Sequence, residues 1–403
     1  MNSISVLLAF SLTLSGGTDP VDEHATWSQW RGPNGTGISP ETEWVSEGKE
    51  KDLWSSFVGL GYSSMVIGNG RLYTMGYDAD AKLDVVYCLD ARSGEEIWAE
   101  AYPAEIWNLA HAGGTVNTPT LDGDKLFTLN REGSLYCFDA KSGEILWQQA
   151  LKDANGLTYH KWGFSGSPLV SGENLILNVG KVMSVNKNTG KTNWISKEYG
   201  HAYSTPLAVE QDGKQRVVVF NGGFLAMLDL ESGAEVCSLE FPPVERGVNA
   251  ASPIQVQDAL LISSGPIGGA RLLAFGEDQF EEVWTSKKMK SSWAASILIN
   301  EHVYGFDNGS MKCLDLQGEE IWKERGHRVG ALAAAGERLI ILNDKGALVI
   351  AEAKPEGYVE LSSTQIFDDE DGEKWSTPVI AGGLIYCRAS NGSLVCRDHR
   401  AGN

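Results

Sequence analysis

One stretch decides the fold: Tyr136-Cys137-Phe138-Asp139-Ala140-Lys141-Ser142-Gly143-Glu144-Ile145-Leu146-Trp147. It consists of a short apolar segment ending in Asp, a tight turn ending in Gly, and a second short segment ending in Trp. The same pattern returns over residues 87–98 and, one residue shorter, over residues 312–322. Looser copies end at Trp194, Cys237 and Trp284.

The copies lie about 38 to 49 residues apart, which is typical of a β-propeller with one four-stranded blade per repeat. Many short strands joined by turns also agree with the 46 glycines of the chain. The sequence therefore predicts an all-β propeller of antiparallel blades.

Each predicted blade begins with a segment that is mostly rich in Ser or Thr, and in five of them Pro follows. Proline cannot donate to a strand ladder, so it favours an edge strand, and the innermost strand of a blade is such an edge. We identify eight blade starts, at Ser63, Asn117, Gly166, Ser204, Ala251, Ala295, Gly330 and Ser376.

The ends of the fourth strands predict how the ring closes. Seven starts are followed by an end, at Trp98, Trp147, Trp194, Cys237, Trp284, Trp322 and, less typically, Val359. The eighth start has no fourth strand, whereas Trp54 is a strand end with no blade before it. We therefore predict that the N-terminal strand completes the C-terminal blade, which gives a closed eight-bladed ring over residues 51–403.

The repeated Trp, Gly and Asp are interpreted as structural. The Trp side chain buries a large area between adjacent blades, the Gly adopts a positive φ, and the Asp accepts turn N–H groups. The predicted blade anchors are Trp54, Trp98, Trp147, Trp194, Trp284 and Trp322.

The N-terminal region divides into two parts. Residues 1–17 contain an apolar run of signal-peptide length, which is too short to anchor the chain in a bilayer. The run departs from the usual signal-peptide pattern in one respect, because no basic residue precedes it. We expect export to the periplasm or another part of the cell envelope, without membrane insertion. Residues 18–50 are turn-rich and aromatic, so we expect an extension packed on the ring.

The net charge of −20 argues against nucleic acid as a partner, because nucleic-acid binding needs a basic face. The same argument applies to an anionic lipid surface. We expect a monomeric ring.

Two of the six cysteines, Cys387 and Cys396, flank the turn Asn391-Gly392. A two-residue hairpin there would place them opposite each other, on the closer, non-hydrogen-bonded kind of pair. Two interpretations stay open: a cross-strand disulfide if the protein is exported, or two packed thiols.

The longest predicted loops all fall on one face of the ring, which favours a binding site there. Aromatic, His and Arg residues in these loops are candidates for a site around the channel mouth, and the alternative is that each packs only its own loop. The candidates are Trp107, His111, His160, Trp162, His201, Arg246, Trp293, Arg325, His327, Arg328 and Trp375.

The sequence assigns no catalytic residue and no metal ligand. It contains no zinc spacing, phosphate loop or nucleophile elbow. The acidic run over residues 368–371 lacks an EF-hand pattern, and we interpret it as a solvated loop.

The repeated Asp-Ala-x-Ser-Gly-x-x-x-Trp motif around eight blades resembles the pyrroloquinoline-quinone-like (PQQ-like) propeller family, from about residue 27 to the end of the chain. The length and the single domain look most like the branch that contains the outer-membrane-protein assembly factor BamB. That resemblance implies a periplasmic, non-enzymatic scaffold that binds envelope proteins. The N-terminus departs from that factor, which carries a lipidated Cys that this chain lacks.

The resemblance also implies an alternative, a PQQ-dependent alcohol dehydrogenase or a degenerate relative of one. In such enzymes the quinone stacks on a Trp, Glu, Asn and Asp hold Ca²⁺, and a vicinal Cys pair covers the cofactor. This chain has no Cys-Cys pair, no haem motif and no matching ligand set. We therefore predict a scaffold without cofactor, with recognition of a carbohydrate or an extended peptide on the long-loop face as a further alternative.

Overall fold

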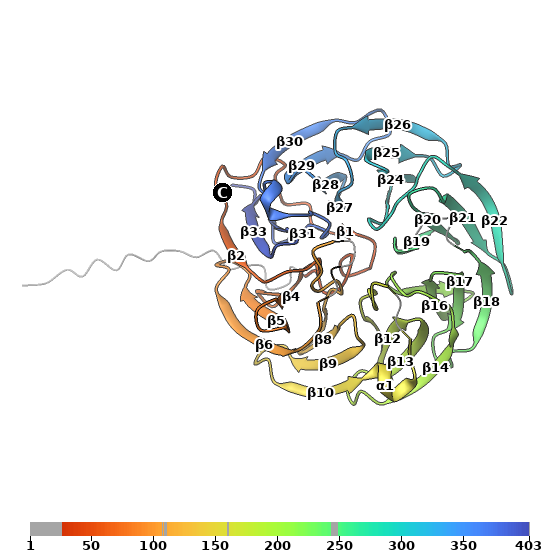
Figure 1. Cartoon of the computed structure of the whole chain (residues 1–403). Coiled ribbons are helices and arrows are strands. Elements are labelled where there is room, and N and C mark those ends of the chain that lie inside the picture. The colour runs from red at the N-terminus through yellow and green to blue at the C-terminus, as the bar shows by residue number, and fades with distance from the viewer. Residues whose placement is uncertain (1–25, 107, 109–110, 159–160, 243–248, 403) are drawn as a thin grey trace, which may run out of the picture.

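Eight sheets, each built on four antiparallel strands, surround a central axis in the computed structural model (Figure 1), and one of them has a fifth strand that pairs in parallel. The structure describes residues 26–106, 108, 111–158, 161–242 and 249–402. The prediction of an eight-bladed propeller is confirmed, and we number the blades by the order of their inner strands. The predicted signal peptide lies outside the described residues.

Blades 1 to 4 follow one another along the chain, each running from its inner to its outer strand. Their strands are β3 (Val66–Gly68), β4 (Arg71–Asp78), β5 (Leu83–Asp90) and β6 (Glu96–Pro103); β7 (Thr120–Asp122), β8 (Lys125–Leu129), β9 (Ser134–Asp139) and β10 (Ile145–Ala150); β11 (Leu169–Ser171), β12 (Asn174–Val179), β13 (Lys181–Asn186) and β14 (Thr192–Glu198); β15 (Leu207–Gln211), β16 (Lys214–Phe220), β17 (Phe224–Asp229) and β18 (Glu235–Glu240).

Blades 5 to 8 complete the ring, and the last two each include a strand from the N-terminal part of the chain. Their strands are β19 (Ile254–Val256), β20 (Ala259–Ser264), β21 (Gly269–Phe275) and β22 (Phe280–Ser286); β23 (Ile297–Ile299), β24 (His302–Asp307), β25 (Ser310–Leu314) and β26 (Glu320–Arg325); β27 (Ala331–Ala335), β28 (Arg338–Leu342), β29 (Ala347–Glu352) and β30 (Glu360–Gln365), with β1 (Ile38–Ser39); β31 (Val379–Ala381), β32 (Leu384–Arg388), β33 (Ser393–Asp398) and β2 (Trp54–Phe57).

The ring closes as predicted, because β2 forms the outer strand of blade 8. It pairs antiparallel with β33, with Trp54 opposite Cys396. At the same seam the fully buried Arg388 guanidinium donates to the carbonyl oxygens of Ser63, Met75 and Gly59. One blade is thus built from both ends of the described chain.

The outer strands interlock with the next blade through their Trp residues. The indole of Trp98 donates to the Ala140 carbonyl of blade 2 over 3.2 Å and lies on Gly143, whose φ is 79°. A Cβ on Gly143 would lie 2.9 Å from the Trp98 ring, so the turn needs glycine for space as well as for its φ. The indoles of the other five predicted anchors make the same kind of bond, to Ala91, Lys187, Leu230, Leu316 and Lys354.

The inner strands of blades 1 to 5 are joined by a row of hydroxyl groups. The backbone N–H of Ser64 donates to the Thr118 hydroxyl, and the pattern repeats from Thr118 to Ser167, Ser167 to Thr205 and Thr205 to Ser252, over 2.9–3.2 Å. We call this row the hydroxyl relay. It explains the Ser or Thr at the starts of blades 2 to 5: the side chain satisfies an edge N–H of the preceding blade, which would otherwise stay unpaired.

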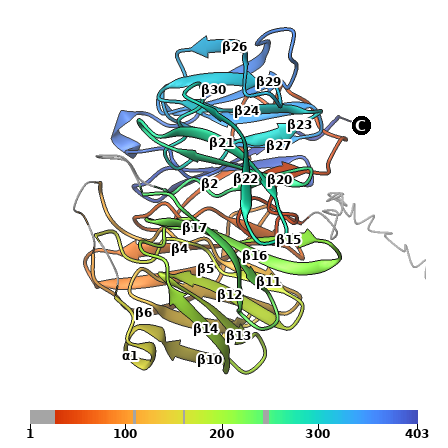
Figure 2. The ribbon, with the colours of Figure 1, turned by 90° about the vertical axis from the view of Figure 1, so that its right-hand side faces the viewer.

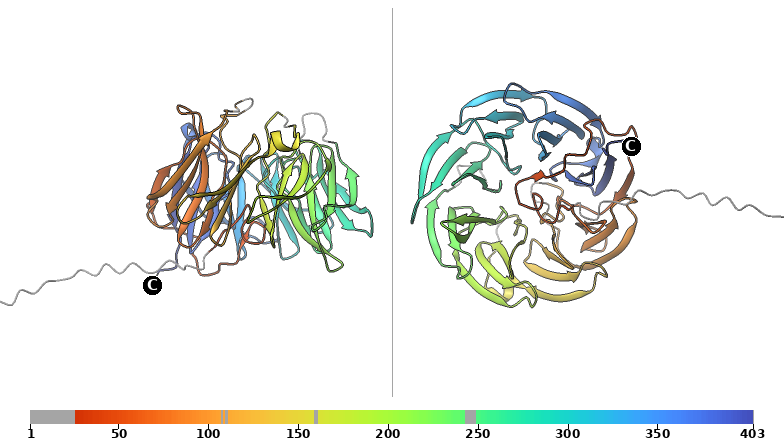
Figure 3. Two further views of the ribbon diagram at one scale, coloured as in Figure 1. Left: turned by 90° about the horizontal axis from the view of Figure 1, so that it is seen from below. Right: turned by 180° about the vertical axis from the view of Figure 1, so that it is seen from behind.

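Two faces of the ring differ. The connections between blades and the hairpins between second and third strands lie on one side, the long-loop face, with α1 (Leu151–Asn155) and η1 (Asp369–Asp371). The short turns lie on the other side, the tight-turn face. Figures 2 and 3 show α1 and the N-terminal segment (residues 26–50) on opposite sides of the ring.

The N-terminal segment covers the channel at the tight-turn face. Trp27 bridges to Ile67 of blade 1, and β1 pairs parallel with β27 of blade 7. The buried Arg31 donates to the Ser296 carbonyl of blade 6 over 2.7 Å, and the Glu41 carboxylate accepts two N–H groups of blade 8. The segment therefore ties the ring together where the described hydroxyl relay does not reach.

The predicted pairing of Cys387 with Cys396 is wrong. Cys387 lies opposite Val395 and Cys396 opposite Tyr386, so the two thiols are on different faces of the hairpin, and both cysteines are free. The Ala389 N–H binds the Ser393 carbonyl and Gly392 has a φ of 108°. The hairpin is thus a three-residue loop with a glycine bulge, and the extra residue shifts the register by one.

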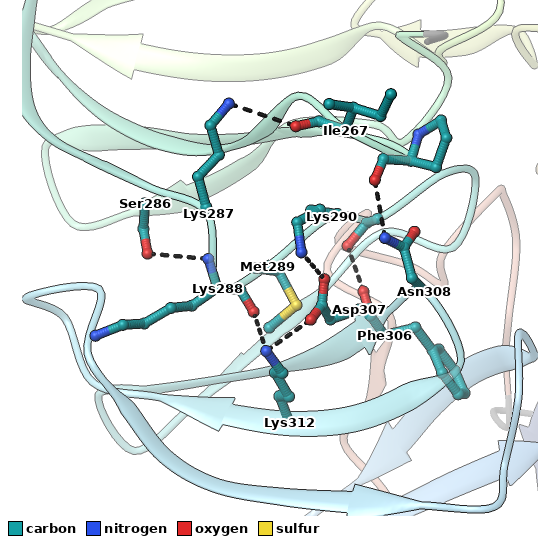
Figure 4. A network of polar contacts seen from close by, with 12 residues as sticks. Ile267, Ser286, Lys287, Lys288, Met289, Lys290, Phe306, Asp307, Asn308 and Lys312 are labelled. Carbon is teal, nitrogen blue, oxygen red and sulfur yellow. Dashed lines mark hydrogen bonds and ion pairs between the residues drawn. The ribbon is translucent and has the colours of Figure 1, made fainter. Parts of the chain in front are cut away.

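The interior between blades 5 and 6 contains ion pairs among apolar side chains (Figure 4). The buried Lys312 ammonium contacts Asp307 at 2.6 Å, Glu320 at 2.7 Å and the Lys288 carbonyl at 2.7 Å. Lys290 contacts the other Asp307 oxygen at 3.1 Å. All three ammonium protons of Lys312 therefore have an acceptor.

None of the helices in the described residues has the length and apolar character to cross a bilayer.

Candidate functional site

A cavity of about 400 Å³ lies on the axis of the ring and opens toward the long-loop face. We call it the axial pocket. Its walls come from the starts of several blades, its floor from the N-terminal segment. The lining residues are Trp30, Tyr62, His111, Val116, Arg131, Trp162, Ser165, Ser167, Tyr203, Thr205, Ala250, Ser252, Trp293 and Trp375.

The blade repeat itself positions six of these side chains. Each lies two residues before the Ser or Thr at a blade start, where the connection turns inward to begin the innermost strand. Ser, Thr and Pro at the next positions fix that strand at the channel edge, so the preceding residue faces the axis. The six residues are Tyr62, Val116, Ser165, Tyr203, Ala250 and Trp375.

Aromatic rings form most of the wall. Tyr62 stacks on Trp375 with centroids 5.3 Å apart and planes at 23°, and Trp293 lies 4.5 Å from Trp375. The Trp162 and Tyr203 rings, from the starts of blades 3 and 4, lie 5.4 Å apart. The five side chains are half-buried, so part of each ring is exposed to the pocket.

Trp30 separates the axial pocket from a second cavity. That cavity has a volume of about 210 Å³ and lies between the N-terminal segment and the inner strands of blades 3 to 5. Trp30, Thr205 and Ser252 line both cavities. The axial pocket and the second cavity therefore adjoin each other at Trp30.

The charge at the pocket wall is positive. Arg131 is buried and is the one Arg or Lys among the described lining residues, which include no carboxylate. Behind it, Asp84 accepts a hydrogen bond from Asn130 at 3.2 Å, and burial raises the pKa of Asp84 to about 7.

The other titratable groups at the wall are neutral or already paired. The Glu373 carboxylate accepts hydrogen bonds from the hydroxyls of Tyr62 at 3.1 Å and Ser390 at 2.8 Å. Burial, followed by the charge of Arg131, lowers the pKa of His111 to about 4. Its Nδ1 accepts the Gly113 N–H at 3.1 Å, so the neutral ring carries its proton on Nε2.

The structure unites some predicted binding residues and separates others. His111, Trp162, Trp293 and Trp375 line the axial pocket, while His201 lies beside it, with its ring 5.7 Å from that of Tyr203. Arg325 and Arg328 are exposed, with Arg328 paired to Asp344, and His327 packs on Tyr358 between blades 6 and 7. Trp107, His160 and Arg246 lie outside the described residues.

Sequence reasoning missed Trp30, Tyr62, Arg131 and Tyr203. Tyr62 and Tyr203 carry a readable signal, since both precede a blade-start Ser or Thr by two residues. Arg131 is in a hairpin like those of other blades, and Trp30 belongs to the N-terminal segment. Nothing local in the sequence marks these two residues as pocket residues.

The pocket does not match a calcium-held quinone. Rings that could stack on a quinone are present, but no described lining side chain is an Asp, Glu or Asn, the oxygen ligands that Ca²⁺ takes from side chains. The nearby Glu373 carboxylate already accepts two hydroxyl protons. In the part of the chain that the structure describes, no group of three or more His, Cys, Asp or Glu residues could hold a metal ion.

Comparisons with known proteins agree with the fold. A family model described as outer membrane protein assembly factor BamB matches residues 82–324. The structure of BamB from Moraxella catarrhalis matches with a TM-score of 0.63 and 15% identity, covering 88% of this chain and 98% of that chain. A comparison with curated protein sequences found no significant match.

Two further structural matches have other activities or origins. Quinohemoprotein alcohol dehydrogenase from Comamonas testosteroni has a TM-score of 0.69 and 12% identity, covering 95% of this chain and 82% of that chain. The computationally designed Ika8 protein has a TM-score of 0.62 and 12% identity, covering 85% and 98%. At these identities the matches establish the fold alone.

Proposed function

Because the chain belongs to the family of the outer membrane protein assembly factor BamB, we propose that it is a non-enzymatic scaffold that binds protein partners in the cell envelope. Export would be directed by residues 1–17. Partner proteins would bind on the long-loop face, and assembly of outer-membrane proteins is the process that the family description suggests.

The observation that carries this proposal is the difference between the two faces. On the tight-turn face the turns are short, and the N-terminal segment covers the channel through contacts with blades 1, 6, 7 and 8. On the long-loop face the channel stays open as an aromatic pocket surrounded by long connections. Loops held on a rigid ring provide the variable contacts that a binding face needs.

The ring itself supplies a stiff support for such a face. Each of the six anchoring indoles fixes its blade to the next one through a hydrogen bond, and five of them also contact the glycine of the turn. The hydroxyl relay fixes the inner strands of blades 1 to 5. Interfaces between pre-organised partners lose less conformational entropy on binding. This favours a platform role.

A quinone-dependent dehydrogenase is the competing function. The position and aromatic wall of the pocket favour it, but the donor set described above argues against the calcium that holds such a quinone. Titration with PQQ and Ca²⁺ by calorimetry distinguishes the two. Stoichiometric, calcium-dependent binding would support the dehydrogenase, and no binding is expected for the scaffold.

Site-specific photo-crosslinking in the native host tests the scaffold proposal. A photoreactive amino acid replaces Lys161 or Arg325 on the long-loop face, and Lys141 or Gln317 on the tight-turn face; all four are exposed. We expect adducts of the same size from both long-loop positions, in the periplasmic fraction, and few from the turn positions.

Equal adducts from both faces, or none from the long-loop face, would contradict this location of the binding site. Recovery of the protein with the cytoplasmic fraction would contradict export. Neither result depends on whether the axial pocket binds a small molecule.

A further inference from the structure

We propose that the axial pocket holds a proline-rich segment of a partner protein in the polyproline II conformation. This inference rests on the scaffold function proposed above and deepens it, because it names the chemistry by which the ring recognises its partner. Two independent observations carry it: the wall offers hydrogen-bond donors but few acceptors, and its apolar surface consists of aromatic rings.

Three hydroxyl groups of the wall are donors. The hydroxyl oxygens of Ser167, Thr205 and Ser252 each accept a backbone N–H in the hydroxyl relay. None of these hydroxyls has an acceptor for its own proton within the described residues, so each has an O–H left to donate. All three residues line the pocket, so a bound ligand would meet a row of donors.

Two indole groups of the wall add to these donors. The Nε1 atoms of Trp162 and Trp293 are buried and have no hydrogen-bond partner among the described residues. An indole N–H can only donate, and a buried donor without an acceptor is costly. A ligand carbonyl placed at the edge of either ring would supply the missing acceptor.

Acceptors of the wall are absent or already occupied. No described lining side chain is Asp, Glu, Asn or Gln. The Nδ1 atom of His111 accepts the Gly113 N–H, and the Tyr62 carbonyl accepts the Ser376 hydroxyl. A ligand with many N–H or O–H groups, such as a sugar or an ordinary peptide, would leave these groups unpaired. A proline residue has a carbonyl and no N–H, so a run of prolines presents acceptors alone.

The aromatic rings supply the matching apolar surface. Tyr62, Trp375 and Trp293 form one cluster, and Trp162 with Tyr203 forms a second one at the starts of blades 3 and 4. Proline-rich segments bind surfaces lined by aromatic rings, where their preformed conformation lowers the entropy lost on binding. The polyproline II helix has no internal hydrogen bonds, and one turn of three residues is about 9 Å long. A cavity of about 400 Å³ suits a segment of this size.

Titration with an acetylated and amidated hexaproline peptide tests this inference. The matched probe has alanine at the two central positions, which adds two N–H groups and removes two rings, and cellohexaose tests a sugar. Binding is followed by calorimetry and by tryptophan fluorescence. We expect saturable one-to-one binding of hexaproline, at least tenfold weaker binding of the alanine peptide, and no binding of cellohexaose.

Variants of the wall assign the binding to the pocket. Trp293→Phe keeps an aromatic ring but removes the indole N–H, so a several-fold weaker binding of hexaproline is expected. Its melting temperature should equal that of the wild type, because the N–H has no partner among the described residues. Trp375→Leu removes a ring from the centre of the first cluster and should weaken hexaproline at least tenfold. Arg325→Gln, an exposed cation on the same face, is the control and should bind hexaproline like the wild type.

The inference is overturned if hexaproline does not bind at millimolar concentration, or if the alanine peptide or cellohexaose binds as tightly. Full affinity in both Trp293→Phe and Trp375→Leu would also overturn it. If hexaproline fails to bind while the crosslinks on the long-loop face persist, this inference falls and the proposed function stands. Loss of those crosslinks with hexaproline still bound would contradict the proposed function instead.

Discussion

Two seams of the ring each bury a cation, but they satisfy it in different ways. Between blades 8 and 1, Arg388 donates to backbone carbonyls and a hydroxyl, and it forms no ion pair with a carboxylate of the described residues. Between blades 5 and 6, Lys312 contacts two carboxylates and one carbonyl. The first seam joins the ends of the chain, whereas the second joins neighbours in sequence.

The difference shows which of the two buried cations depends on the correct register of ring closure. The acceptors around Arg388 come from residues 59–75, which surround it only when the N-terminal strand has docked in the correct register. A buried guanidinium without acceptors is costly, so a wrong closure is penalised. The acceptors of Lys312 all come from one region of the sequence, so its burial does not depend on correct closure of the ring.

Removing the guanidinium at the closing seam should have the largest effect. In Arg388→Met, three buried carbonyls lose their donor, and each such loss costs about 1–3 kcal/mol, so we expect the unfolding free energy to fall by at least about 3 kcal/mol. Unfolding in guanidinium chloride measures this. Arg71→Met is the control, because Arg71 donates to two carbonyls at a half-exposed seam, and it should cost less than about 1 kcal/mol. Equal losses in the two variants would remove the special role of the closing seam.

A third buried ionisable group, Asp84, differs from both, because it accepts its hydrogen bond from the neutral amide of Asn130. Burial raises the pKa of Asp84 to about 7. Its contribution to stability is complete below its unfolded pKa of about 4 and is lost as pH rises through 7, by up to about 4 kcal/mol. Asp84→Asn should therefore be more stable than the wild type at pH 8 and similar to it at pH 4.5.

Asp139→Asn should change the pH dependence of stability in the opposite direction. The Ser142 hydroxyl and turn N–H groups lower the pKa of Asp139, so its contribution is present above its unfolded pKa and is lost in acid. That variant should be less stable than the wild type at pH 8. Melting temperatures at the two pH values test both substitutions, and a pH-independent difference for Asp84→Asn would exclude its buried carboxyl as the cause.

A smaller effect than at the closing seam is expected at the seam between blades 5 and 6. Lys312→Met leaves Asp307 with Lys290 and Glu320 with solvent, so we expect a loss of about 2 kcal/mol, below the ~3–5 kcal/mol of a fully isolated buried charge. Adding Asp307→Leu should restore part of the loss, because the buried Asp307 carboxylate has then lost one of its two cationic partners, whereas Lys290 is partly exposed to solvent. A double variant less stable than the single one would contradict this explanation.

The repeat made the fold predictable because each signal has a local physical cause. Trp147 and Gly190, for example, need each other, since a Cβ on Gly190 would lie 2.7 Å from the indole. The composition of blade 8 from both ends of the described chain was predicted by counting strand ends, because Trp54 was a strand end without a blade of its own. The hairpin at Asn391-Gly392 was read in the wrong register, because the same dipeptide serves a two-residue turn and a three-residue loop with a bulge.

The axial pocket was only partly predictable. Trp162, Trp293 and Trp375 were found because they lie in long loops near the axis. Trp30 and β1 were not, because their positions depend on contacts with blades hundreds of residues away, such as that of Arg31 with Ser296. Arg131 was likewise not predicted as a pocket residue, because only the folded ring brings it next to the aromatic side chains of the wall.

Blade 8, which combines β2 with β31 to β33, also fixes an order of events during synthesis. Trp54 is made early but pairs with Cys396, which is made last, so the first strand of the ring waits with an unpaired edge while seven blades form. Contacts of such long sequence separation form slowly, and unpaired edges invite association with other chains. The waiting strand is only four residues long, Trp54–Phe57, directly after Lys51 and Asp52. Its shortness and the preceding charges limit wrong pairing until the last hairpin arrives.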